Sequence, residues 1–134
     1  MKILKGFAVL FAFCVIASSN IGTFAVSNTP DSNLTYNQAM TMNKPVVVEF
    51  YADWCGACKR VAPILNEIKP EYASKFNFVN LNIDNPENSV LSNKFNVKSL
   101  PSIFIVNPKT GEAKFLNQNN YFSTDTLRKE LDSY

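Results

Sequence analysis

Two cysteines stand close together in the segment Trp54-Cys55-Gly56-Ala57-Cys58. Residues i and i+3 share one face of a helix, so a helix that begins here brings the two sulfur atoms together. The unpaired N–H groups and the positive dipole end of a helix N-terminus stabilise a thiolate, so we expect Cys55 to have a pKa below that of a free thiol. Cys55 would attack a disulfide, and Cys58 would resolve the mixed disulfide. The spacing alone also fits an inert structural disulfide or part of a zinc site.

The composition excludes several other kinds of chemistry. The 134 residues include no histidine, which excludes a Ser-His-Asp triad, a Cys-His pair and a His-ligated metal. Zinc takes about four protein ligands, so a metal site is not expected, and the redox-active pair Cys55–Cys58 needs no further cofactor. The formal net charge is +2, with two of the positive charges at Lys2 and Lys5. This distribution predicts no nucleic-acid partner, which would need a clustered basic face.

The first 25 residues have the pattern of a secretory signal peptide. Lys2 and Lys5 precede an apolar run over 6–17, and small residues follow up to Ala25. We expect cleavage after Ala25. The alternative is an uncleaved membrane anchor, because ~20 apolar residues are enough to span a bilayer. Both interpretations predict an extracytoplasmic protein, either periplasmic or secreted, which is membrane-bound only if the segment stays uncleaved.

This targeting segment also accounts for the odd number of cysteines. Cys14 lies within the apolar run, which leaves Cys55 and Cys58 as one pair in a compartment where disulfides persist. The expected division of the chain is a signal peptide or anchor over 1–25, a linker over 26–33 and one domain over 34–134.

The order of the expected elements predicts an α/β fold. Residues 45–51 form a run of β-branched and aromatic residues, which is typical of a strand buried on both faces. Apolar residues with helical spacing follow over 55–73. Helices and strands continue to alternate up to a last helix that Ser123 or Thr124 can cap. We expect a central mixed sheet of four to five strands flanked by helices. The expected helices are 34–42, 55–73, 86–95 and 124–131, and the expected strands are 45–51, 76–83, 101–106 and 113–116.

The amino-acid sequence around the cysteines resembles that of thioredoxin. Residues 46–68 read VVVEFYADWCGACKRVAPILNEI and include a strand, a Trp before the first cysteine, a Lys after the second and Pro63. Residues 95–102, FNVKSLPS, are similar to the segment that carries the cis-proline of that family. The resemblance extends from about residue 35 to the C-terminus, and it implies a thioredoxin-like fold.

The resemblance also implies roles for single residues. Cys55 matches the nucleophile and Cys58 the resolving cysteine. Glu49 falls where thioredoxins carry a buried acid, whose raised pKa would let it pass a proton to or from Cys58. Lys59 would assist the thiolate electrostatically.

A second group of residues is expected to bind the substrate. A cis bond at Pro101 would place the Leu100 backbone beside an extended substrate segment. Trp54 matches the indole that faces the substrate in the family. The spacer residues Gly56 and Ala57 complete this group.

The sequence departs from thioredoxin at several places, and the usual first strand is hard to find over 26–36. Ala57 replaces the proline that is usual there, and Asn80 stands where a lysine often lies near the buried acid. Residues 118–120, QNN, replace a glycine in the loop before the last helix. The wording YADWC-x-ACK is similar to the soluble domains of membrane-linked thiol:disulfide interchange proteins.

The expected function is therefore an extracytoplasmic enzyme that reduces or exchanges protein disulfides. Its expected partners are protein dithiols or disulfides and an upstream thiol electron donor, for which a membrane protein is one candidate, and a monomer is expected. Two alternatives stay open. One is a disulfide oxidase or isomerase, and the other is a non-catalytic thioredoxin-like binding module.

Overall fold

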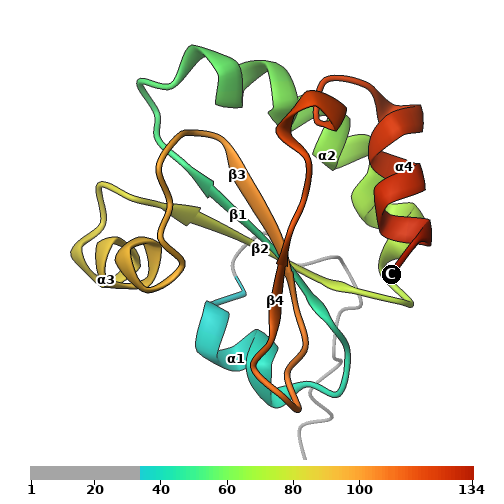
Figure 1. Ribbon diagram of the computed structural model, residues 1–134, viewed down its shortest axis with the longest axis horizontal. Coiled ribbons are helices and arrows are strands. Elements are labelled where there is room, and N and C mark those ends of the chain that lie inside the picture. The colour runs from blue at the N-terminus through green and yellow to red at the C-terminus, as the bar shows by residue number, and fades with distance from the viewer. Residues whose placement is uncertain (1–33) are drawn as a thin grey trace, which may run out of the picture.

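A four-stranded mixed sheet forms the centre of the computed structural model, which describes residues 34–134 (Figure 1). The strands are β1 (Val46–Tyr51), β2 (Asn77–Asn82), β3 (Ser102–Val106) and β4 (Ala113–Phe115), in the order β2-β1-β3-β4. β1 is parallel to β2 and antiparallel to β3, and β3 and β4 form an antiparallel hairpin. The predicted α/β fold with a central mixed sheet is confirmed. The predicted signal peptide or anchor and the linker fall outside the described residues.

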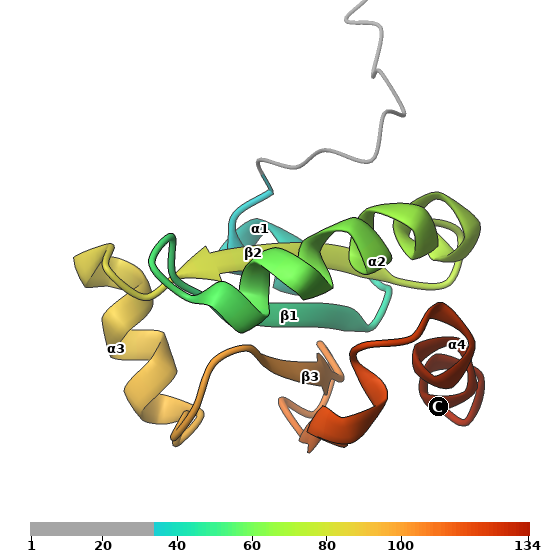
Figure 2. The same cartoon turned by 90° about the horizontal axis from the view of Figure 1, so that it is seen from above.

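Helices cover both faces of this sheet. They are α1 (Tyr36–Thr41), α2 (Gly56–Tyr72), α3 (Pro86–Lys94) and α4 (Thr124–Asp132). Figure 1 shows α2 and α4 on one side of the strands and α1 and α3 on the other, and Figure 2 shows α2 lying across β1 and β2. None of the helices within 34–134 has the length and apolar character needed to cross a membrane.

Side-chain alternation along β1 divides the interior into two cores. Val46, Val48 and Phe50 point into the core beneath α1 and α3, whereas Val47 packs with α2 and α4. Every residue of β1 except Tyr51 is buried, as expected for a central strand with helices on both faces. Glu49 is two residues after Val47, so its side chain lies on the same face of the strand and points toward α2.

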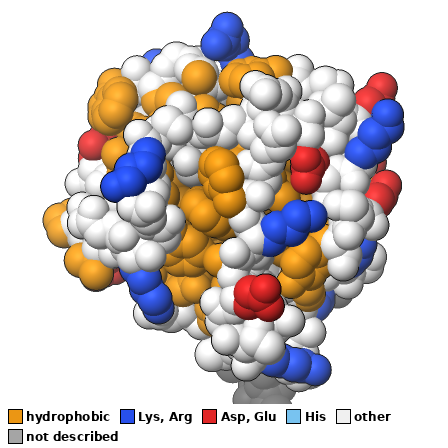
Figure 3. All heavy atoms as spheres, viewed as in Figure 1, with side chains coloured by type: hydrophobic (Ala, Val, Ile, Leu, Met, Phe, Trp, Pro, Cys, Tyr) orange, Lys and Arg blue, Asp and Glu red, His pale blue; other side chains and the backbone are white. Residues whose placement is uncertain are grey.

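The hairpin partner β4 is the edge strand on the opposite side of the sheet from β2. Its three residues are exposed, and Phe115 keeps 49% of its surface accessible. Figure 3 shows the molecule in the view of Figure 1, with apolar side chains gathered near the middle and charged side chains around them.

The start of α4 differs from the predicted cap. Ser123 occupies the N-cap position, but its side chain makes no capping hydrogen bond, and Thr124 is already the first helical residue. The Thr126 hydroxyl donates to the carbonyls of Asn120 and Ser123, at 2.8 and 3.0 Å. Ser123 is therefore at the predicted cap position but lacks the expected side-chain hydrogen bond. A short 3₁₀ helix, η1 (Gln118–Asn120), precedes α4 and was not predicted.

Tyr121 joins this C-terminal region to the sheet. Its side chain is fully buried, and its hydroxyl accepts a hydrogen bond from the Ile103 N–H at 3.0 Å and donates one to the Leu116 carbonyl at 2.8 Å. We expect Tyr121→Phe to lower the free energy of unfolding by about 1–3 kcal/mol, because two buried backbone groups lose their partner. Urea unfolding measures this loss.

Tyr36 provides the matched control for that substitution. It is partly exposed, and its hydroxyl makes no hydrogen bond to the described residues. Tyr36→Phe should change stability by less than about 0.5 kcal/mol. Equal losses in the two variants would contradict the role assigned to the Tyr121 hydroxyl.

Candidate active site

The two cysteines of the CxxC segment form a disulfide at the start of α2. Cys55 is the N-cap residue of the helix, and the Cα atoms of Cys55 and Cys58 are 5.3 Å apart. The Cys58 N–H donates to the Cys55 Sγ, at 3.1 Å. The first turn of α2 contains no acidic residue. In the reduced state, this N–H group and the helix dipole favour the Cys55 thiolate, because both interact more strongly with a negative charge.

The disulfide is only slightly exposed. Cys55 exposes 6% of its surface and Cys58 exposes 3%. They form a small cluster with Ala52, and the partly buried side chains of Ala57 and Leu100 pack against it. Gly56 is exposed, and a side chain there would meet no atom within 4 Å.

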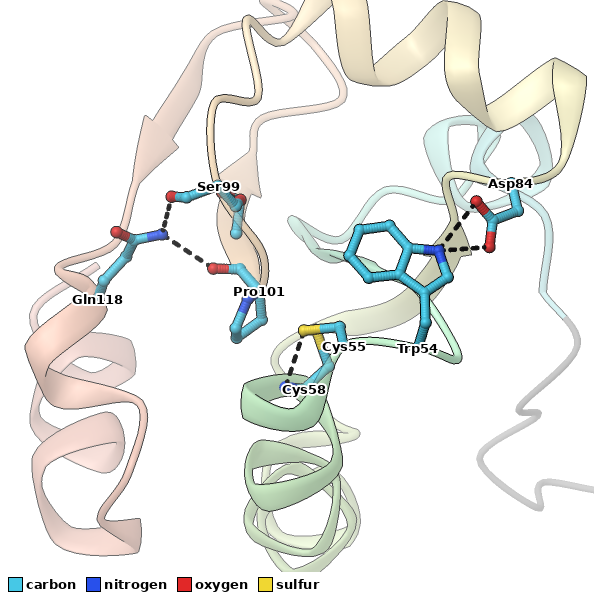
Figure 4. Close-up of a disulfide and its surroundings, with 8 residues drawn as sticks. Trp54, Cys55, Cys58, Asp84, Ser99, Pro101 and Gln118 are labelled. Carbon is cyan, nitrogen blue, oxygen red and sulfur yellow. Dashed lines mark hydrogen bonds between the residues drawn. A yellow bond between two sulfur atoms is a disulfide. The ribbon is translucent and has the colours of Figure 1, made fainter.

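Trp54 borders the disulfide on one side and projects outward (Figure 4). Its side chain is 68% exposed, although tryptophan is usually well buried. The indole N–H donates to the Asp84 carboxylate, at 3.0 Å to Oδ2 and 3.3 Å to Oδ1. Asn82 supports this arrangement, because its Oδ1 accepts from the Asp84 N–H and its Nδ2 donates to Asp53. The indole is thus held at the surface in one orientation.

The loop before β3 borders the disulfide on the other side. The Leu100–Pro101 peptide bond is cis, Pro101 is buried and Leu100 packs against the cysteine cluster. Figure 4 shows Pro101 next to the disulfide, on the side opposite Trp54. The described structure thus brings together five of the residues singled out in the sequence: Trp54, Cys55, Cys58, Leu100 and Pro101.

Behind the disulfide, Glu49 lines a cavity of about 250 Å³ that also reaches Cys58. Glu49 exposes 4% of its surface, and its carboxyl group makes no hydrogen bond to the described residues. Desolvation raises the pKa of this carboxyl to about 7, and the charge of Lys69 opposes the rise. Near neutral pH, Glu49 can therefore hold or release a proton next to Cys58.

The charged and titratable neighbours of this carboxyl come from three elements. The cavity is lined by Lys59 and Lys69 of α2, Tyr51 of β1 and Asp53 of the following turn. Lys59 itself is exposed, so the structure gives it only a position at the mouth of the cavity.

Lys69 is a cation that the sequence did not single out. Its Nζ donates to Asn80 Oδ1, at 3.2 Å. Burial lowers the pKa of Lys69, and the charge of Glu49 acts in the opposite direction. Thioredoxins often carry a lysine near the buried acid at the position of Asn80. Here the lysine that acts on Glu49 is Lys69, which comes from α2 and not from β2.

Among residues 34–134 no group of three or more Cys, Asp and Glu side chains is placed to hold a metal ion.

Comparison with known proteins identifies the family. The thioredoxin family model matches residues 26–133. The chain belongs to the thioredoxin family. Its site is accordingly that of a thioredoxin-family thiol–disulfide oxidoreductase with a disulfide-bonded Cys55–Cys58 pair.

Individual relatives agree with this membership. The chain is 36% identical over 87 residues to thioredoxin from Haemophilus influenzae, covering 56% of this chain and 79% of that protein. It is 44% identical over 70 residues to the thioredoxin-like protein HCF164, chloroplastic, from Arabidopsis thaliana, covering 52% of this chain but only 27% of that protein. Among solved structures, thioredoxin NaTrxh from Nicotiana alata superposes with a TM-score of 0.59 at 28% identity, covering 72% of this chain and 78% of that one.

Sequence reasoning missed three residues of this thioredoxin-family site. They are Asp84, which holds the indole of Trp54, Lys69, which lines the cavity, and Gln118, which contacts the cis-proline loop. Of these, only Gln118 lies in a stretch that the sequence marks out, because residues 118–120 depart from the thioredoxin pattern. Nothing in the spacing of Lys69 indicates that it points at a strand.

Proposed function

We propose that this thioredoxin-family protein reduces the disulfides of other proteins outside the cytoplasm. The observation that carries the proposal is the position of Cys55. It caps α2, accepts the Cys58 N–H, and lies between an exposed, fixed indole and the loop of Leu100 and Pro101. A nucleophilic sulfur beside an exposed apolar surface and a loop backbone suits an extended polypeptide substrate.

The reaction begins from the reduced pair. The Cys55 thiolate attacks one sulfur of the substrate disulfide, so that a new S–S bond forms and the other substrate sulfur leaves as a thiolate. Cys58 then loses its proton and attacks Cys55 Sγ, which releases the second substrate sulfur as a thiolate. Two electrons have moved from the cysteine pair to the substrate, and the substrate thiolates take up protons. A dithiol donor returns the pair to its reduced state by the same exchange in reverse.

Glu49 supplies the proton acceptor in this scheme. It shares the cavity with Cys58, and its pKa of about 7 lets it exist as a carboxylate at neutral pH. Taking the proton of Cys58 produces the thiolate that resolves the mixed disulfide. Lys69, held by Asn80, keeps part of the carboxyl population ionised.

The proposed compartment is supported by the N-terminal sequence and by two relatives. Residues 1–25 have the charged start, apolar run and small residues of a signal peptide. Thioredoxin-like HCF164 proteins from Arabidopsis thaliana and Oryza sativa are described as chloroplastic. Expression of the full chain in a bacterium, followed by mass measurement of the exported protein, should show a chain that begins at Val26. Recovery of all of the intact chain from the cytoplasm would contradict an extracytoplasmic role.

The direction of electron flow is tested by a redox titration. The purified protein is equilibrated with defined ratios of reduced and oxidised dithiothreitol, and the Cys55–Cys58 disulfide is quantified by thiol labelling. We expect a midpoint near that of thioredoxin, which is about −270 mV. A midpoint near about −120 mV, typical of a strong disulfide-forming oxidant, would overturn the reductase and support the oxidase.

A further inference from the structure

Gln118 lies at the start of η1 and reaches across to the cis-proline loop. Its side-chain Nε2 donates to the Ser99 hydroxyl at 2.7 Å and to the Pro101 carbonyl at 3.0 Å (Figure 4). These two contacts span 19 and 17 residues of sequence. A glutamine therefore fastens η1 to the loop that borders the disulfide.

The loop has few other contacts of this kind. Within the described chain, the only other hydrogen bond between residues 98–101 and a side chain is the one that Ser102 donates to the Ser99 carbonyl, at 2.7 Å. Leu100 lies between the two residues that Gln118 holds, and its side chain packs against the cluster of Cys55 and Cys58. The position of Gln118 thus fixes the Leu100 segment relative to the reacting sulfur atoms.

The chemistry of the amide suits two tasks at once. Its NH₂ group has two N–H donors. One donates to the Ser99 hydroxyl and the other to the Pro101 carbonyl. Its Oε1 makes no hydrogen bond to the described residues, and the side chain is partly exposed. The oxygen is therefore available to an N–H group of a segment bound along the loop.

We propose that Gln118 is a positioning residue that fixes the Ser99–Pro101 loop against the disulfide and thereby favours extended polypeptide disulfides over small ones. The inference rests on the proposed exchange with polypeptide disulfides. A small disulfide touches only the sulfur atoms, so its rate does not depend on the loop. A polypeptide that lies along the loop loses affinity when the loop is no longer held.

The test compares Gln118→Met with the wild type. Methionine has a similar length and shape but no N–H donor. We expect KM for a peptide disulfide to rise about tenfold with little change in kcat. Without the bonds from residue 118, the loop binds the peptide less well, but the sulfur atoms that react are unchanged. The rate with bis(hydroxyethyl) disulfide should stay unchanged. Gln118→Lys keeps an N–H donor at this position and should recover most of the lost affinity.

Gln38→Met is the matched control, because it makes the same chemical change in α1, where the Gln38 side chain hydrogen-bonds only to Thr35 among the described residues. It should leave both rates unchanged. An unchanged KM in Gln118→Met, an equal loss with both disulfides, or a failure of Gln118→Lys to recover affinity would each overturn the inference. A wild type that exchanges with no peptide disulfide would instead overturn the proposed function.

Discussion

We expect Cys55→Ser to abolish disulfide reduction, so that the rate with any disulfide falls to that of a solution without the protein. The attacking sulfur is lost, and no other cysteine lies at the position of the α2 N-cap. Serine at that position cannot form the disulfide intermediate, because a hydroxyl does not undergo thiol–disulfide exchange. The measurement is the steady-state reduction of a protein disulfide with a dithiol as the electron source.

Cys58→Ser should also stop turnover, but for a different reason. Cys55 can still attack, so one equivalent of substrate becomes attached and is not released. Cys14→Ser makes the same chemical change at the third cysteine, in the predicted targeting segment, and should leave turnover unchanged. Normal turnover in Cys55→Ser would show that exchange does not proceed through this residue.

Among substitutions that leave both cysteines in place, Glu49→Gln should give the largest effect. The amide has nearly the same shape as the carboxyl but takes no proton, so Cys58 loses its proton acceptor. We expect release of the mixed disulfide at pH 7 to be about 100-fold slower, at the lower end of the range for general base catalysis. In the wild type this step speeds up as the pH rises through about 7, where Glu49 ionises. The variant should lack this rise, and stopped-flow measurements from pH 5 to 9 record it.

The stability of the protein should report the same group. Because folding raises the pKa of Glu49 from 4.5 to about 7, the folded state binds the proton more tightly than the unfolded state. The contribution of Glu49 is therefore most favourable below pH 4.5 and is lost as the pH rises to about 7, at a cost of about 3 kcal/mol. Glu49→Gln should flatten the decline of unfolding free energy over this pH range. An unchanged decline would contradict the raised pKa.

Lys69→Met separates the charge of the cavity from its proton acceptor. Lys69 lowers the pKa of Glu49, so its removal should move the rise in the rate of release to higher pH while preserving it. Lys94→Met, at an exposed position of α3, is the matched control and should leave the profile unchanged. A profile that is the same in Lys69→Met and the wild type would show that Lys69 does not act on Glu49.

The features that sequence could predict are those written in short, continuous patterns. The apolar run over 45–51 indicates a central strand because helices cover both of its faces, and the alternation of helices and strands then gives the sheet. The cysteine spacing indicates a pair at a helix start, because residues three apart are neighbours on one face of a helix. Glu49 interrupts an apolar strand, and that contrast is itself visible in the sequence.

The remaining features depend on contacts between distant segments. Trp54 meets Asp84 across 30 residues, and Gln118 meets Ser99 across 19. Lys69 is partly buried on α2, and its hydrogen bond to Asn80 forms only because that helix packs on the sheet. The missing cap bond at Ser123 is different, because the residue stands at the N-cap position and only its side-chain hydrogen bond is absent.

The central claim, that Cys55 attacks and Cys58 resolves, is tested most directly by locating the bond to a trapped substrate. Reduced Cys58→Ser and reduced Cys55→Ser are each mixed with a peptide disulfide, quenched with acid, digested and mapped by mass spectrometry. We predict one peptide per chain on Cys55 in Cys58→Ser and none on Cys58 in Cys55→Ser, because Cys55 caps the N-terminus of α2 whereas Cys58 lies inside its first turn and faces the cavity of Glu49. Attachment to Cys58, or no attachment in either variant, would contradict the account.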